Sequence, residues 1–104
     1  MEFDIEKSLK DMNAAASGVI LDKSPQVQDC IKKALEEEKQ ALLNIAKARL
    51  SNQINDDDVN SQLEDEKIAL EAAMLACQVK SKELAQSGAN AAINSLLVSI
   101  GEAI

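Results

Sequence analysis

The stretch SNQINDDDV, residues 51–59, decides the fold, because it is the one part in the middle of the chain that lacks a helical pattern. Two segments of nearly equal length flank it, residues 25–53 and 59–87, and neither contains a glycine or an internal proline. Alanine, leucine, glutamate, lysine and glutamine, all good helix formers, dominate both segments. The sequence therefore predicts an antiparallel hairpin of two long helices that reverses at this turn.

The acidic residues at the end of the turn match a helix start better than a calcium loop. Counted from Asp56, an EF-hand would need glycine at its sixth position and glutamate at its twelfth, where this chain has Ser61 and Lys67. Aspartate at a helix N-terminus accepts hydrogen bonds from free amides and interacts favourably with the helix dipole. Ser61 with Glu64 also matches a capping box, so we expect the helix to begin between residues 56 and 60.

A shorter helix is predicted before the hairpin. Apolar residues recur at steps of three and four between about residues 2 and 21, as in a short amphipathic helix. Ser24 followed by Pro25 then indicates a turn and a new helix, with serine as the N-cap and proline at the first helical position.

The chain becomes nearly uncharged towards its C-terminus. Between Leu84 and Ile104 the one charged residue is Glu102. Gly88 is expected to end or bend the third helix, and an apolar helix follows it. The predicted fold class is all-α, an antiparallel helical hairpin with a short N-terminal helix and an apolar C-terminal helix. This is a three- to four-helix bundle that forms one domain over residues 1–104.

The two long helices differ in their apolar patterns. The heptad stripe of the second helix contains one charged residue, Glu38, which we expect to face a wet gap or to pair with a lysine or arginine. The third helix has two apolar stripes: Leu63, Leu70, Met74, Cys77 and Leu84, and beside them Ile68, Ala72, Leu75 and Val79. Two stripes make a face wide enough to contact two neighbouring helices at once.

Composition limits the classes of partner. Phe3 is the sole aromatic residue, so the core must be aliphatic and thin, and oligomerisation is a natural way to bury more area. The net charge of −7 disfavours binding to nucleic acid or to anionic lipid, and favours basic or neutral partners. The acidic start MEFDIEK is unlike a secretory signal, no apolar run is long enough for a membrane span, and a cytoplasmic location is expected.

The two cysteines are interpreted as buried apolar residues. Cys30 and Cys77 lie far apart, outside any CxxC pattern, and both fall on apolar helix faces. This pattern favours free thiols in a reducing compartment over a disulfide. Two cysteines without histidine offer too few ligands for zinc, so neither a metal nor a cofactor is expected.

Catalysis is not expected, because the chain has no histidine or tyrosine and its carboxylate runs fan around a helix rather than converge. The function predicted is non-enzymatic and acts through helix–helix packing, with the protein as a homo-oligomer or filament subunit. The alternatives are a soluble adaptor, chaperone or antitoxin-like protein that uses the apolar C-terminal helix, and a self-contained bundle. The predicted interface residues are Leu70, Met74, Leu84, Ile93, Leu96, Leu97 and Ile100.

The stretch VILDKSPQ, residues 19–26, resembles the step between the first and second helices of the R-body (killing-trait) family of small bacterial proteins. Leu9, Asp11, Ile20 and Leu21 fall where that pattern has similar residues, as do the Ser24–Pro25 pair. Members of that family assemble into coiled ribbons, so the resemblance implies a structural, self-assembling role. Residues 32–39 are mostly charged here, whereas the family's second helix is rich in alanine, glutamine and asparagine.

Overall fold

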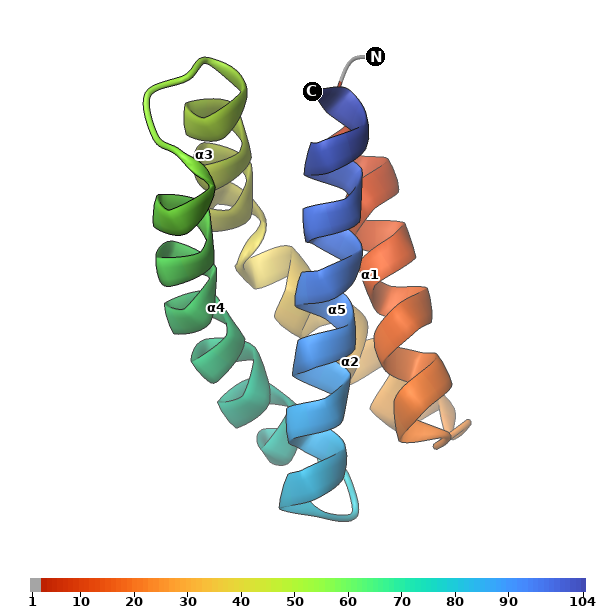
Figure 1. Cartoon of the computed structure of the whole chain (residues 1–104). Helices are drawn as coiled ribbons and strands as arrows, with labels where there is room; N and C mark the ends of the chain where they lie inside the picture. The colour runs from red at the N-terminus through yellow and green to blue at the C-terminus, as the bar shows by residue number, and fades with distance from the viewer. Residues whose placement is uncertain (1–2) are drawn as a thin grey trace.

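The computed structural model describes residues 3–104 and consists of five α-helices, with no strand in that range. The helices are α1 (Ile5–Ile20), α2 (Pro25–Glu37), α3 (Lys39–Leu50), α4 (Asp56–Ala76) and α5 (Lys82–Ala103) (Figure 1). The all-α class is confirmed, with five helices where three to four were expected. The first helix was predicted to begin at Glu2, which lies outside the described residues.

Helix α5 lies at the centre of the packing. It runs beside α1 along most of its length and also contacts α4, while α3 and α4 lie together on the other side (Figure 1). The inward face of α5 begins with small residues and ends with large aliphatic ones, all buried: Ala85, Gly88, Ala89, Ala92, Ile93, Leu96 and Ile100. Small side chains let neighbouring helices approach closely, and α5 uses them where α1 and α4 meet it.

Gly88 lies inside α5, so the prediction that it ends or bends the preceding helix is wrong. A Cβ at this position would lie 2.7 Å from Ile20 Cδ1 and 3.1 Å from Met74 Sδ. Ile20 belongs to α1 and Met74 to α4, and both are buried. The glycine is therefore needed for close approach of three helices rather than for a turn.

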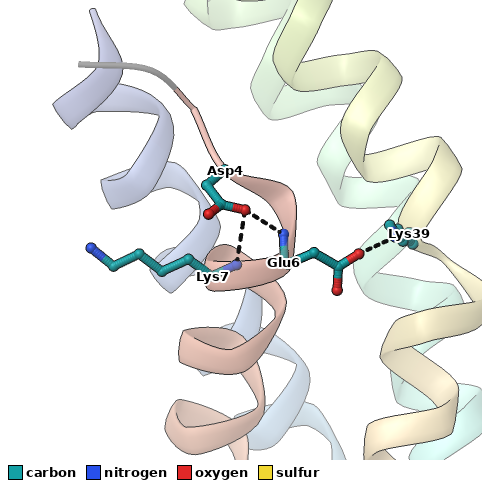
Figure 2. Close-up of polar contacts among 4 residues, drawn as sticks. All are labelled: Asp4, Glu6, Lys7 and Lys39. Atoms are coloured by element: carbon teal, nitrogen blue, oxygen red, sulfur yellow. Dashed lines mark hydrogen bonds and ion pairs between the residues drawn. The ribbon is translucent and has the colours of Figure 1, made fainter.

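Polar contacts fix the ends of the first two helices. The Asp4 carboxylate caps α1 by accepting hydrogen bonds from the amides of Glu6, at 3.0 Å, and Lys7, at 3.3 Å (Figure 2). The Glu6 side chain is ion-paired with Lys39 at the start of α3, so the α1 N-terminus is held beside the middle of the chain (Figure 2). Ser24 caps α2 and Pro25 is its first residue, as the sequence predicts.

The predicted long helix over residues 25–53 is interrupted at Glu38. The Glu38 amide donates to Leu35 O at 3.2 Å in a tight turn, and a new helix starts at Lys39. Neither glycine nor proline marks this break, and the local residues are good helix formers. The packing of the two helices differs across the break: α2 contacts α1 about as much as α4, whereas α3 contacts chiefly α4.

The turn after α3 is stabilised by capping at the start of α4. Asn55 Oδ1 accepts from the Asp58 amide at 2.9 Å, and Asp58 Oδ2 accepts from the Asn55 amide at 3.1 Å. Arg49 Nε lies 2.6 Å from Asp56 Oδ1 across the turn. The start at Asp56 is within the predicted range, but the capping box predicted at Ser61 and Glu64 is wrong, since both residues lie inside the helix.

Helix α4 ends at Ala76, earlier than the predicted end near residue 87. Gln78 takes a left-handed backbone conformation with φ of 64°, and Ser81 then caps α5 by accepting from the Leu84 amide at 3.1 Å. A left-handed residue after a helix stops its propagation.

A disulfide joins Cys30 in α2 to Cys77 at the end of α4. The prediction of two free thiols is therefore wrong. The residues lie 47 positions apart in sequence, but α2 and α4 pack together, so their Cα atoms lie 5.6 Å apart. Helix packing, which spacing in the sequence does not report, brings the pair together.

Gly88→Ala is expected to destabilise the fold by about 1 kcal/mol. Overpacking against Ile20 and Met74 typically costs about 1–3 kcal/mol, and removing a helical glycine returns up to about 1 kcal/mol. Urea unfolding measures the difference. The matched control is Gly101→Ala in the same helix, where a Cβ meets nothing within 4 Å, so that this variant should gain stability. Equal gains in both variants would contradict the close approach.

Reduction of the disulfide is expected to lower the free energy of unfolding by about 2–4 kcal/mol, because the bond restricts the unfolded chain. Urea unfolding with and without a phosphine reductant measures the loss. A Cys30→Ala/Cys77→Ala variant should show no response to the reductant. An intact mass with two free thiols in the protein as purified from its own cells would overturn the disulfide.

Candidate functional site

Most of the predicted interface residues lie in the protein's own core. Leu70, Met74 and Leu96 are fully buried, and Ile93 and Ile100 are 6% and 3% exposed. The other two, Leu84 and Leu97, are half-buried against that core. The apolar side of α5 therefore packs inside the single chain.

The outer face of α4 leaves a row of apolar residues exposed. Its stripe is Ile68, Ala69, Ala72, Leu75 and Ala76, here called the α4 outer face. The side chain of Ile68 is 58% exposed and that of Leu75 is 40% exposed. These residues correspond to the second stripe seen in the sequence, except that Val79 is buried because the helix ends before it.

This face lies opposite the buried side of α4. The buried side is formed by Val59, Leu63, Leu70 and Met74. Residues at i, i+4 and i+7 share one side of a helix, which places Ile68, Ala72 and Leu75 in one row. The sequence predicted one wide apolar face on this helix, whereas the structure buries one stripe and leaves most of the other exposed on the opposite side.

Most of the net charge of the protein is concentrated on α4. The helix holds seven of the eighteen acidic residues and one of the eleven basic residues, which gives it −6 when all its carboxyls are ionised. The remainder of the chain then carries −1, from the total of −7. The single basic residue, Lys67, is already paired with Glu64 at 2.8 Å. The α4 outer face is thus an apolar row with a carboxylate border.

The outward face of α5 has a different character. Ser87, Asn90, Asn94, Val98 and Gly101 follow one another at steps of three and four and are all exposed. None of them is charged, and Val98 is 60% exposed. This face is neutral and formed of small or polar residues, in contrast to α4.

Two carboxyl groups meet at the α2–α3 break. Glu38 is half-buried there and faces Glu66 of α4 rather than a lysine or arginine. A hydrogen bond with the Glu38 side chain, followed by burial and by repulsion from Glu38 and Asp65, raises the pKa of Glu66 to about 7. Glu66 Oε2 is buried without a partner. Two ionised carboxylates have no donor between them, so this oxygen gains a partner only when a proton is bound.

The described residues contain no arrangement typical of a metal site. Within residues 3–104, no three side chains of His, Cys, Asp or Glu lie close enough together to hold a metal ion. The aspartates at the start of α4 are no exception. The hollow between α1 and α2 is lined by Lys10 and Lys32 together with Glu6 and Glu36, so its charges balance.

Comparison with protein-family models, with curated proteins and with solved structures returned no match. Among the helices of the described part of the chain, none is both long and apolar enough to cross a membrane.

Glu66→Gln is expected to remove a pH dependence of stability. The folded-state pKa of Glu66 lies above its unfolded value near 4.5, so its contribution is complete below pH 4.5 and is lost as the pH rises through about 7. Wild type should therefore lose on the order of 1–3 kcal/mol between pH 5 and pH 8, after allowance for solvent screening.

The measurement is thermal unfolding across that range. Glutamine resembles the protonated carboxyl, so Glu66→Gln should match wild type at pH 5 and exceed it at pH 8. Glu37→Gln, on the exposed side of α2, is the control and should leave the slope unchanged. If the stability of Glu66→Gln still falls between pH 5 and pH 8 as steeply as that of wild type, a group other than Glu66 causes the pH dependence.

Proposed function

We propose that this protein is a non-enzymatic, partner-binding helical protein whose binding surface is the α4 outer face. The observation that carries the proposal is the exposure of Ile68 and Leu75 in one row, on the side of α4 opposite the core. Contiguous exposed apolar surface in a small soluble domain is typical of an interaction site. The role is that of an adaptor, chaperone or antitoxin-like protein, acting through α4 in place of the C-terminal helix.

Burial of α5 favours this choice of surface. The C-terminal helix was the expected binding element, but its large aliphatic residues pack against α1 and α4. Freeing them for another chain would require unfolding of the protein's own core, at a cost that a partner would have to offset. The α4 outer face needs no such rearrangement.

Self-assembly is the second candidate, and the outward face of α5 favours it. That face is neutral, so two copies could approach through it without repulsion, and Ser87 and Gly101 leave room for close helix contact. The resemblance of residues 19–26 to the R-body family supports the same role. A homo-oligomer or filament built in this way would use Val98 as its exposed apolar contact.

The disulfide supports a location different from the cytoplasm expected from the sequence. Disulfides persist in oxidising compartments and are rare where thiols are kept reduced. We infer that the protein folds and acts in an oxidising compartment, where Cys30 and Cys77 stay joined.

Site-specific photo-crosslinking in the cells that produce the protein tests both candidates. A photoreactive residue at position 68 or 75 should yield a discrete crosslinked species, because a partner covers these positions. The same residue at position 33 is the control, since Lys33 is exposed on α2 outside either face. It should yield none.

The mass and origin of the crosslinked species separate the outcomes. A species from position 68 or 75 that contains a second, different protein supports the partner-binding proposal. If crosslinks form only from position 98, and the crosslinked species has twice the mass of the chain, the result supports self-assembly instead of binding to another protein. An absence of crosslinks from positions 68 and 75 overturns the assignment of the α4 outer face.

A further inference from the structure

We infer that the element bound by the α4 outer face is a cationic amphipathic helix of another protein, which lays its apolar side along Ile68, Ala72 and Leu75 and its basic residues against the carboxylates of α4. This inference rests on the proposed function and specifies the partner of the same surface. Its support is the shape of the apolar row, the sign of the charges beside it, and the exclusion of a second copy.

The apolar row has the dimensions of a helix contact. Ile68 and Leu75 lie seven residues apart, which is about 10 Å along a helix, or two turns. Between them lies Ala72, with Ala69 and Ala76 on one flank, all exposed. Two large side chains separated by alanines form a ridge with a shallow centre, which matches the i, i+3/i+4 and i+7 anchors of an amphipathic helix.

The charges beside the row are negative. Glu64 and Asp65 lie one turn before Ile68, and Glu71 lies one turn before Leu75, so all three border the apolar residues. Asp57 extends the same side towards the start of the helix and is exposed. Charge complementarity steers association and selects the partner, which calls for lysine or arginine on the occupant.

A second copy of this chain does not fit the face. A two-fold dimer brings the same surface of both copies together, so α4 would lie against α4. The carboxylates of Asp57, Asp65 and Glu71 border this face and would lie against the same groups of the second copy, and Lys67 is already bonded to Glu64 of its own chain. Repulsion between like charges therefore opposes self-pairing through this face.

Three synthetic peptides added to the full, oxidised protein test the inference. The first is an amphipathic helix of leucine and lysine, the second has glutamate at each lysine position, and the third is the leucine–lysine peptide with its order scrambled. Backbone amide shifts in two-dimensional NMR report where each peptide binds, and titration gives its dissociation constant.

The expected result is saturable binding of the leucine–lysine helix, with shifts centred on residues 64–76, and no binding of the glutamate peptide. The scrambled peptide should bind at least about tenfold more weakly, since it lacks an apolar side. Added salt should weaken binding without abolishing it, because salt screens the charges and leaves the apolar contact.

Two sets of variants separate the apolar and the charged contributions. Ile68→Ser/Leu75→Ser should weaken binding at low and at high salt, whereas Glu64→Gln/Asp65→Asn/Glu71→Gln should weaken it mainly at low salt. Each loss is expected to be about tenfold. Val98→Ser, on the outward face of α5, is the control and should bind as wild type does. Circular dichroism confirms that each variant is folded.

The outcomes distinguish this inference from the proposed function. If the glutamate helix or the scrambled peptide binds as tightly as the leucine–lysine helix, the partner is not a cationic amphipathic helix. The α4 outer face would still be the binding surface. Peptide shifts confined to other helices overturn the surface itself. Concentration-dependent shifts at residues 68–76 without any peptide would show that the occupant is a second copy, contrary to the charge argument.

Discussion

The close approach of α1, α4 and α5 at Gly88 is the constraint on which the remaining structure depends. Phe3 is the one aromatic residue in the chain and is only partly buried, so cohesion requires helices that approach closely over many small contacts. Ile20 and Met74 occupy the space that a side chain at position 88 would take. This contact draws the apolar side of α5 inward, and α4 is left with one face in the core and the opposite face in solvent.

The helical class, the cap at Ser24 and the residue range in which α4 starts could be predicted, because capping chemistry and periodicity are local, but the capping box of α4 was assigned to the wrong residues. Sequence patterns did not predict the break at Glu38 or the end of α4 at Ala76. Glutamate and lysine around position 38 favour helix, so local propensity does not predict the break. The left-handed residue after α4 is Gln78 rather than the usual glycine, so the residue type did not predict that the helix ends there. The disulfide was missed for the same reason, since neither spacing nor residue type shows that α2 and α4 are neighbours.

The candidate site was located in part. The two apolar stripes of α4 were expected to form one wide face, and the pattern alone did not show that only one of them would be buried. The uncharged C-terminal segment was the stronger hint of an exposed surface, but its large aliphatic side is buried and its polar side is the exposed one. Which apolar surface is exposed matters because of the charges beside it. An apolar stripe with an acidic border favours basic partners over acidic ones, whereas a neutral apolar surface such as the buried side of α5 would discriminate little between partners.

The Cys30–Cys77 bond also changes the covalent topology of the chain. Residues 30–77 form a closed ring, and the reversal at residues 51–55 lies within it, with its residues mostly exposed. A protease that cuts this loop once leaves the two fragments tied together, with α1 and α5 still attached to opposite pieces. Phe3 and Ala103 line one hollow, so the first and last parts of the described chain lie close together. A circular permutant opened at residues 51–55 would therefore have its two segments joined both by the new link and by the disulfide.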